Sequence, residues 1–362
     1  MKIGILTFHS AYNYGAFLQT YAMQEYLQSL GHDVCIINYA PIYFEQGYSV
    51  FPLWDFKKLN IQKKLFRLVG NIILFLPRLR RKNVFKEAIN KQLKISGRKL
   101  KNTSDIENVI SNYDALIFGS DQIWNPKITR GFDDVFWGNF DFDGKKIAYA
   151  ASVGDDFLPL ENQEIQHLLD SFLAISVRER ELSNFLDTRF NIKTDMVVDP
   201  TLLLSKNDWT SHLSKKIKTR FVFLYIVIPS ENALRVAKRI ADELKIKLIT
   251  VYAGISHKPI TWKNASCSPL DLVNYINSCA FFVTTSFHGT AFAINLQKQF
   301  YVVKTTHENK RVNNLLEITN LTNRLIIDES SIDLKNNIDW NVVAFNEEII
   351  KSKSFIQGAL LG

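Results

Sequence analysis

The sequence has few cysteines and no long apolar run. Its 362 residues include three cysteines, Cys35, Cys267 and Cys279, which lie far apart and form no Cys-x-x-Cys pair. So sparse a set argues against a disulfide framework and a zinc site, and we expect a protein of the reducing cytoplasm. No apolar stretch approaches the roughly 20 residues that a membrane-spanning helix requires. The opening residues, MKIGILTFHS, have too short an apolar part for a signal peptide and indicate a first strand instead.

Several familiar enzyme motifs are also missing. The chain contains no Gly-x-Gly-x-x-Gly turn, no phosphate-binding loop with its lysine, no His-Glu-x-x-His pair and no Cys/His cluster with metal-ligand spacing. These absences disfavour a nicotinamide-dependent enzyme, a P-loop nucleotide hydrolase and a zinc hydrolase. We therefore expect neither a metal nor a tightly bound cofactor.

One stretch has almost no acidic residues. Residues 57–101 contain 15 Lys and Arg and a single acid, Glu87, so the segment carries +14 while the rest of the chain carries −6 of the total +8. Its centre, LFRLVGNIILFLPRLRRK, combines large apolar residues with a cluster of cations. Two interpretations remain open: the segment lies on an anionic membrane surface, or it forms a helical hairpin that packs on the first domain with a solvated basic face. Nucleic acid is disfavoured as a partner, because it offers nothing to the apolar part.

Short apolar runs that indicate buried strands alternate with amphipathic stretches along most of the chain. The first β-α-β unit has helical spacing in NYGAFLQTYAMQEYLQSLG and a helix-ending glycine at Gly31. A polar, lysine-rich stretch at residues 205–220 interrupts the alternation, which then resumes with FVFLYIV. This pattern predicts an α/β protein with two doubly wound, Rossmann-like domains that face a cleft. We expect the domains to span residues 1–205, with a basic helical insertion at about 50–105, and residues 206–338, followed by a helix within 339–362 that packs back on the first domain.

Polar residues gather where the predicted strands end, which is where parallel α/β sheets bind ligands. The most informative of these segments is TSFHGT. We expect Gly289 and Thr290 to open a helix whose free backbone amides attract an anion. An anion bound there would hold His288 in its protonated form, ready to donate a proton. The alternative is that Ser286 is only a helix cap and His288 a structural hydrogen bonder.

Cations follow two other predicted strands. Arg178 comes directly after the apolar run LAISV, a position that suits a bidentate clamp for a carboxylate or phosphate. The alternative is an ion pair with Glu179 or Glu181. In the second domain, the segment VVKTTHENKR either brings cations towards the same cleft or forms a solvated helix start. These cations are Lys304, His307, Lys310 and Arg311.

The segment GSDQIWNP combines an acid, amides and an indole just before a proline. Asp121, Gln122, Trp124 and Asn125 suit a sugar site, in which the apolar face of the sugar stacks on the indole and its hydroxyls are hydrogen-bonded. An ordinary turn that contains aspartate is the alternative. The first strand–helix turn supplies three residues for the opposite lip of the cleft. They are Asn13, Tyr14 and Gly15.

Six segments, in this order along the chain, resemble the polysaccharide pyruvyl transferase family. They are NYGAFLQTYAM, FGSDQIWNP, YAASVG, SVRERE, VVDPTLLL and TSFHGTAFAI, and the resemblance extends to about Arg324. It implies a GT-B-like pair of domains, with the acceptor on the first and the donor on the second. It also implies transfer of pyruvate from phosphoenolpyruvate to a sugar, which gives a pyruvate ketal on a precursor of a surface polysaccharide, such as an exopolysaccharide or capsule. We expect a lipid-linked oligosaccharide as acceptor, and a cytoplasmic enzyme that meets the inner face of the membrane through residues 57–101.

This chemistry suggests roles for the residues singled out above. His288 is the candidate acid, and Asp121 is expected to accept the proton of the attacking hydroxyl. The donor-binding set is Arg178, Ser286, Gly289, Thr290, Lys304 and Arg311. The acceptor-binding set is Asn13, Tyr14, Gly15, Gln122, Trp124 and Asn125.

One position departs from the family pattern. Many members have an arginine just before the histidine–glycine pair, whereas this chain has Phe287. One anion clamp is thereby missing, and Arg311 or Lys304 is expected to replace it. Two other functions remain open: a GT-B glycosyltransferase that uses a nucleotide sugar, and a non-catalytic scaffold in polysaccharide assembly.

Overall fold

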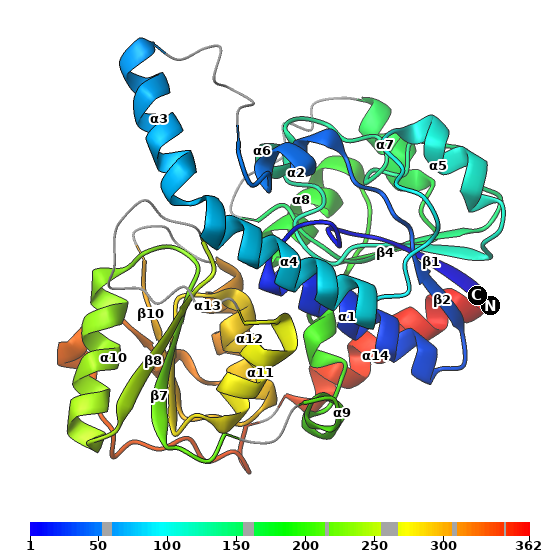
Figure 1. The fold of residues 1–362 in the computed structure, drawn as a ribbon. Helices are drawn as coiled ribbons and strands as arrows, with labels where there is room; N and C mark the ends of the chain where they lie inside the picture. The colour runs from blue at the N-terminus through cyan, green and yellow to red at the C-terminus, as the bar shows by residue number, and fades with distance from the viewer. Residues whose placement is uncertain (53–59, 155–162, 214–216, 255–266, 306–309, 344) are drawn as a thin grey trace.

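Figure 1 shows two α/β domains in a computed structural model of the chain, which describes residues 1–52, 60–154, 163–213, 217–254, 267–305, 310–343 and 345–362. The strands of the first domain are β1 (Lys2–Leu6), β2 (Asp33–Ile36), β3 (Ala115–Phe118), β4 (Lys145–Ala151), β5 (Ala174–Val177) and β6 (Asp195–Met196). Those of the second domain are β7 (Phe221–Ile226), β8 (Lys247–Tyr252), β9 (Phe281–Thr284), β10 (Phe300–Val303) and β11 (Leu325–Ile326). The helices are α1 (Tyr14–Ser29), α2 (Ile42–Gly47), α3 (Ile61–Ile73), α4 (Phe75–Gln92), α5 (Thr103–Ile110), α6 (Pro126–Thr129), α7 (Gln163–Asp170), α8 (Arg180–Phe190), α9 (Lys206–Ser211), α10 (Glu231–Leu244), α11 (Pro269–Ser278), α12 (Phe287–Asn295), α13 (Lys310–Ile318) and α14 (Asn346–Leu361).

The two sheets are parallel, which confirms the predicted α/β fold with two doubly wound domains. Their strand orders are β2-β1-β3-β4-β5-β6 and β11-β10-β9-β7-β8. Every residue of β3 and of β9 is buried, as expected where helices cover both faces of a parallel sheet. In each sheet the strand order reverses beside the first strand of the domain, between β1 and β3 and between β7 and β9. The loops after these four strands therefore meet at switch points, where open α/β sheets bind ligands.

Side-chain caps fix where the helices at the cleft begin. Asn13 caps α1, and its Oδ1 accepts a hydrogen bond of 2.8 Å from the backbone N–H of Gly15. Ser286 caps α12, and its Oγ accepts one of 3.2 Å from the N–H of Gly289. Because each cap sets the first residue of its helix, it also sets which side chains of the first turn face the cleft. Beyond the other end of α1, Gly31 has a φ of 84°, a conformation that glycine adopts without strain.

The described part of the basic segment forms α3 and α4, whereas Lys57 and Lys58 lie outside the described residues. Helix α4 packs along α1. Phe85 of α4 is fully buried, and the side-chain amide of Gln24 in α1 donates a hydrogen bond of 2.9 Å to the backbone oxygen of Gln92. This half of the segment therefore matches the prediction of a helix packed on the first domain.

Arg81 links α4 to both domains. Its guanidinium donates to the backbone oxygen of Tyr12 in the first domain and to that of Ala253 in the second. Helix α3, in contrast, extends away from the body of the protein (Figure 1). Among the described residues, no helix combines the length and the apolar character needed to cross a membrane.

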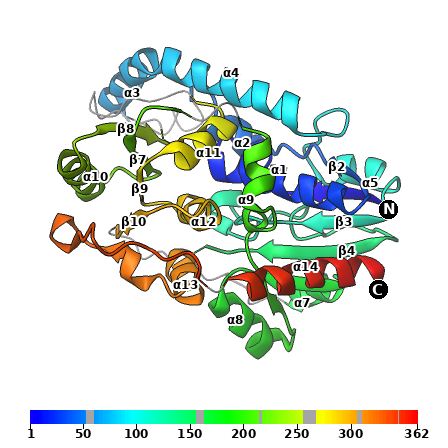
Figure 2. The same cartoon turned by 90° about the horizontal axis from the view of Figure 1, so that it is seen from below.

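The chain returns to the first domain at its C-terminal end. The hydroxyl of Ser352 in α14 accepts a hydrogen bond of 2.9 Å from the N–H of Val198, and Lys145 Nζ donates one of 2.7 Å to the backbone oxygen of Leu360. In Figure 2, α14 lies beneath β4 of the first sheet. The two connections between the domains therefore run through the region around α9 and the segment before α14.

One apolar core runs through both domains. It contains residues of β1 and α1 in the first domain together with residues of β7, α11 and α12 in the second. At the boundary, the indole of Trp209 in α9 packs edge-on against Phe292 of α12, with ring centroids 4.9 Å apart. Figure 2 shows α9 where the two domains meet. Two further clusters, one in each domain, cover the other faces of the sheets.

Candidate functional site

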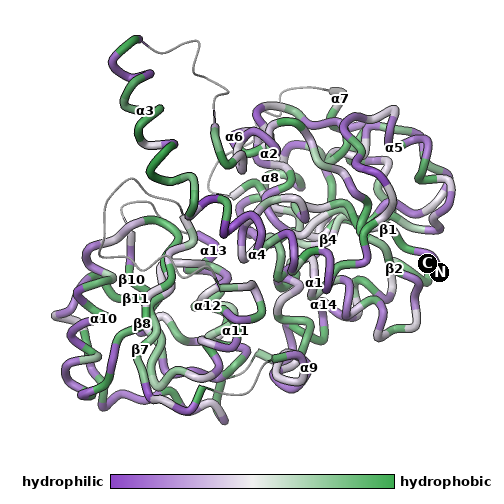
Figure 3. The backbone as a smooth tube through the Cα atoms, in the orientation of Figure 1, coloured by the Kyte–Doolittle hydropathy of each residue, from purple (hydrophilic) through white to green (hydrophobic). Residues whose placement is uncertain are grey.

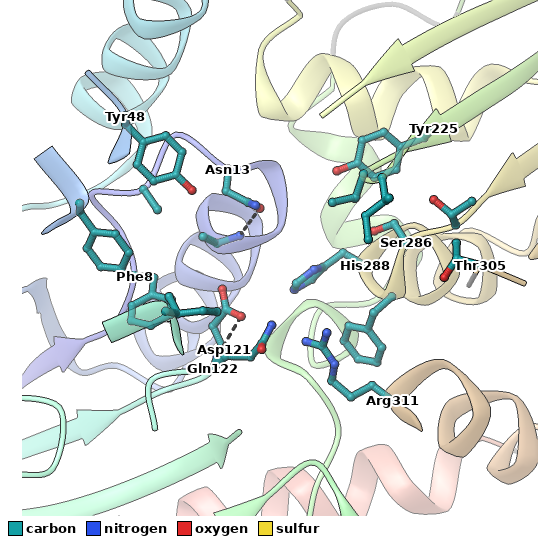
Figure 4. A pocket seen from close by; sticks show the side chains of 18 residues that line it. Phe8, Asn13, Tyr48, Asp121, Gln122, Tyr225, Ser286, His288, Thr305 and Arg311 are labelled. Atoms are coloured by element: carbon teal, nitrogen blue, oxygen red, sulfur yellow. Dashed lines mark hydrogen bonds between the residues drawn. The ribbon is translucent and has the colours of Figure 1, made fainter. Parts of the chain in front are cut away.

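A cavity of about 230 Å³ lies between the domains at the two switch points. The first domain contributes the loops after β1 and β3 together with α2, and the second contributes the loops after β7 and β9 and the start of α13. Figure 4 shows Asn13 and Asp121 on one side of it and His288 and Arg311 on the other. The predicted site residues that line the cavity are Asn13, Asp121, Gln122, Ser286, His288 and Arg311.

His288 lies in the wall of this cavity, with 14% of its side chain exposed. It is the second residue of α12, which begins at Phe287 rather than at Gly289 as the sequence suggested. The expectation of free amides at Gly289 and Thr290 is therefore wrong, because both donate to Ser286: the first to the side-chain oxygen and the second to the backbone oxygen. The first-turn amides that precede them, those of Phe287 and His288, lie at the positive end of the helix.

Gly15 of the first domain lies directly beside the imidazole. A Cβ atom added at Gly15 would lie 2.2 Å from Nδ1 and 2.4 Å from Cε1 of His288. The starts of α1 and α12 therefore meet across the domain boundary, and only a residue without a side chain leaves room for the ring. Gly15 belongs to the site for this steric reason and does not itself line the cavity.

A buried aspartate that the sequence analysis left without a role connects the cations of the site. Asp199 Oδ2 lies 2.6 Å from Nη1 of Arg178 and 3.6 Å from Nε2 of His288, and Oδ1 accepts a hydrogen bond of 2.8 Å from the hydroxyl of Thr201. Burial alone would raise the pKa of Asp199, but the neighbouring His288 and Arg178 hold that pKa well below its ordinary value. The only sequence signal for Asp199 was its place in the segment VVDPTLLL.

The ring of Phe287 contacts two arginines. The guanidinium carbon of Arg178 lies 5.2 Å from the centre of the Phe287 ring, and that of Arg311 lies 5.6 Å from it. Such cation–π contacts stabilise each charge and keep the two guanidinium groups on a common apolar spacer. Arg178 is buried against Asp199 and does not line the cavity, so the expectation of an open anion clamp at Arg178 is wrong. Arg311 is the arginine that reaches the cavity wall.

Asp121 provides a carboxylate on the opposite wall. It follows β3, has a φ of 75°, and accepts a hydrogen bond of 2.9 Å from the N–H of Gln122. Aspartate tolerates this left-handed conformation better than most residues. Its Oδ1 lies 3.8 Å from Nη2 of Arg178, so Asp121 and Asp199, both from the first domain, share one buried guanidinium.

Three residues expected to bind the acceptor stabilise the fold instead. Trp124 is 1% exposed, and its indole N–H donates a hydrogen bond of 3.1 Å to the backbone oxygen of Phe136. The buried hydroxyl of Tyr14 donates one of 3.1 Å to the backbone oxygen of Cys267. Asn125 caps α6. A polar side chain requires a partner when it is buried, and here each of these three finds it within the protein.

The sequence predicts two more cations near the cleft, Lys304 and His307, and no metal site. Lys304 is exposed at the end of β10 and does not line the cavity, so it is not positioned as a donor ligand there. His307 lies outside the described residues. Within the part of the chain that the structure describes, no group of three or more His, Cys, Asp or Glu residues is placed to hold a metal ion. The cavity thus offers an imidazole, a guanidinium and a carboxylate, which suit acid–base chemistry on a small anion.

Comparison with known proteins adds a family and a fold. The family profile described as polysaccharide pyruvyl transferase matches residues 13–307. A search of curated protein sequences finds no match. Similar solved structures include the UDP-GlcNAc 2-epimerase of Methanocaldococcus jannaschii in complex with UDP-GlcNAc and UDP, with 13% identity, 100% of both chains covered and a TM-score of 0.54. Another is a protein of Listeria monocytogenes assigned as a UDP-N-acetylglucosamine 2-epimerase, with 9% identity, 98% of this chain and 90% of that chain covered, and a TM-score of 0.52. At such low identity the likeness shows the fold alone, a GT-B-like pair of domains.

Proposed function

The chain belongs to the polysaccharide pyruvyl transferase family, and on that basis we propose that it moves pyruvate from phosphoenolpyruvate to a sugar of a lipid-linked oligosaccharide. The product is a pyruvate ketal, formed on the cytoplasmic side of the membrane during biosynthesis of a surface polysaccharide. One observation carries the proposal. His288, with Asp199 behind it, lies beside Arg311 on one wall of a small cavity whose other wall holds Asp121.

The size and charge of the cavity suit phosphoenolpyruvate as donor. The molecule is small and carries a carboxylate and a phosphate, so it requires cationic or amide-rich subsites. The cavity of about 230 Å³ is smaller than the roughly 300–1,000 Å³ of clefts for drug-sized ligands. Arg311, the imidazole of His288 and the N-terminal end of α12 all favour an anion at this wall.

The reaction begins when a sugar hydroxyl adds across the double bond of phosphoenolpyruvate. His288 gives its proton to the methylene carbon, which becomes a methyl group, while the hydroxyl oxygen bonds to the adjacent carbon and Asp121 takes the hydroxyl proton. Phosphate then leaves with the electrons of its bond to that carbon. A second hydroxyl of the same sugar takes its place, closes the ketal ring and releases its proton. The products are the ketal and inorganic phosphate, and no oxidant or reductant is required.

Asp199 acts on this chemistry as a positioning residue. Its buried carboxylate lies 3.6 Å from Nε2 of His288 and so keeps the ring at the cavity wall. The same carboxylate holds Arg178 against Phe287, whose ring Arg311 also contacts. The donor wall is therefore assembled before any substrate arrives, which is what efficient electrostatic catalysis requires.

Mass spectrometry of an acceptor oligosaccharide after incubation with phosphoenolpyruvate tests the proposal directly. The expected result is an added pyruvate ketal with release of one phosphate. His288→Ala should lower the rate by about 10²–10⁴-fold, the usual contribution of a general acid, with an unchanged melting temperature. His212→Ala, at a histidine of which 44% of the side chain is exposed, is the matched control. Unchanged ketal formation in His288→Ala would reject His288 as the general acid. Polysaccharide assembly that depends on the protein but yields no ketal would favour a non-catalytic scaffold.

A nucleotide sugar is the second candidate for the donor, because the fold is shared with an enzyme that binds UDP-GlcNAc. Thermal shift measurements with phosphoenolpyruvate and with a set of nucleotide sugars separate the two. We expect stabilisation by phosphoenolpyruvate that is weakened in Arg311→Gln. Stabilisation by a nucleotide sugar alone would overturn the choice of donor.

A further inference from the structure

Helix α3 exposes large apolar side chains. Phe66 is 73% exposed, and Figure 3 shows apolar residues along a helix that extends away from both domains. The exposed apolar residues of α3 and the start of α4 are Ile61, Leu65, Phe66, Leu68, Val69, Ile72, Ile73, Phe75 and Leu76. A contiguous exposed apolar patch of this kind marks a surface that binds a partner or a membrane.

The patch follows the helical repeat. Ile61, Leu65, Leu68, Val69 and Ile72 recur at intervals of three and four residues and so form one stripe on α3. Of the cations of the helix, Lys63 and Arg67 lie on the other side of the helical wheel and Lys64 lies at the edge of the stripe. The helix contains no acid. An apolar face with aromatic and branched residues opposite a basic face is the pattern of helices that lie in the interface of a bilayer.

The junction of α3 with α4 is fixed to the protein. Asn71 is 1% exposed, its side-chain N–H donates to the backbone oxygen of Pro52 at 3.2 Å, and its oxygen accepts a hydrogen bond of 2.7 Å from Arg78. Arg81, one turn further along, binds both domains. The apolar stripe therefore has a defined direction relative to the cleft, so a surface that captures α3 also orients the whole molecule.

The charge of the segment distinguishes between possible partners. From residue 61 to residue 92 the only acid is Glu87, and it is paired with Lys91 at 2.6 Å. A second copy of the chain would bring the same positive charges together, which disfavours self-association through this face. Nucleic acid would satisfy the cations but leave the apolar stripe in water. An anionic bilayer satisfies both, since its headgroups attract the cations and its interfacial region accepts the apolar side chains.

We propose that α3 is a membrane-docking helix, whose apolar stripe inserts into the interface of an anionic bilayer while the basic residues of α3 bind its headgroups. A second cavity, of about 350 Å³, lies beside this region and is lined by Arg78, Arg81 and Lys82. It shares Asn13 and Tyr48 with the cavity that contains His288. This second cavity forms a cationic groove, suited to the phosphates of a lipid-linked acceptor, and docking would make it lead from the membrane to His288. For the lipid-linked acceptor the inference rests on the proposed function.

Vesicle flotation of the full chain tests the docking. We expect binding to vesicles of phosphatidylcholine with phosphatidylglycerol, little binding to phosphatidylcholine alone, and weaker binding at high salt. Replacing Leu65, Phe66 and Ile72 by serine should lower the partition coefficient at least tenfold. Replacing Ile327 and Ile350, both 62% exposed, by serine is the matched control and should change nothing. Because all five side chains are exposed, the variants should fold, as their melting curves will show.

Three results would overturn the docking helix. The wild type could fail to float with anionic vesicles, or the triple serine variant could float as well as the wild type. Alternatively, sedimentation could show a wild-type dimer that the triple variant loses, which would make a second copy the partner of α3. Ketal formation on a soluble, lipid-free acceptor is measured in parallel. The triple variant should retain it, so a failure of docking and a failure of the proposed transferase activity give different results.

Discussion

Replacing Gly15 by alanine tests the site, because it displaces the imidazole of His288 without removing any functional group. The added Cβ would lie 2.2 Å from Nδ1 of His288, whereas ordinary contacts of such an atom begin at 3.4 Å. The imidazole would therefore have to retreat by about 1 Å, either away from Asp199 or out of the cavity wall. A misplacement of about 1 Å in a reacting group costs on the order of 10²-fold in rate.

The fold should survive this change. Gly15 lies in the first turn of α1, and alanine is favoured over glycine within a helix by up to about 1 kcal/mol, which offsets part of the steric strain. We expect kcat for ketal formation to fall about 100-fold with a small change in melting temperature. KM for phosphoenolpyruvate should change little, because Arg311 stays in place.

Gly358→Ala is the matched control. This glycine lies in α14 with no atom within 4 Å of an added Cβ, so the substitution brings the helical gain without a clash. Steady-state phosphate release and mass spectrometry of the ketal are measured for both variants. A Gly15→Ala enzyme whose kcat stays within a few-fold of the wild type would refute the claim that the position of His288 limits the chemistry.

Three further predictions concern buried groups. Asp199→Asn should abolish most activity and lower the free energy of unfolding by about 3–5 kcal/mol, because it removes the closest charged partner of the buried Arg178 guanidinium; a denaturant titration that shows no loss would contradict the buried ion pair. Phe287→Arg restores the residue common in the family, but it should weaken phosphoenolpyruvate binding and lower the melting temperature, because it brings a third guanidinium close to Arg178 and Arg311. Tighter donor binding would show that arginine and phenylalanine are interchangeable at position 287. Burial lowers the pKa of His9 from 6.5 to about 4, so the unfolded chain takes up a proton between these values that the folded chain does not. The free energy of unfolding should therefore be highest above pH 6.5 and fall by about 3 kcal/mol as the pH drops to 4, and His9→Gln should remove this part of the slope.

The sequence sufficed for the residues whose place follows from the topology. Asn13, Asp121 and His288 each follow a buried strand, and in parallel sheets the carboxyl ends of strands meet at one edge. Their meeting in one cavity therefore required only that the strands be identified. The prediction for Arg311 followed from the same reasoning, applied to the segment after β10.

The residues that the sequence misplaced depend on burial and on long-range contacts. The segment GSDQIWNP does not by itself predict that Trp124 is buried and donates a hydrogen bond to the backbone oxygen of Phe136. An indole suits a buried position and a sugar site equally well. The start of α12 was set at Gly289, whereas the helix begins at Phe287, directly after its cap Ser286. Asp199 was left without a role because its partners, Arg178 and His288, come from different domains and are brought together only by the packed fold.

The core that continues from one domain into the other has a consequence for the cooperativity of the whole chain. If either half came apart on heating, the apolar surface of α1, α11 and α12 would be exposed to water, so we expect neither half to be stable without its neighbour. We therefore expect calorimetry to record a single unfolding endotherm, although the molecule has two domains. The same continuity fills the bottom of the crevice with packed side chains, so we expect motions between the domains to be confined to its rim, where donor and acceptor would enter.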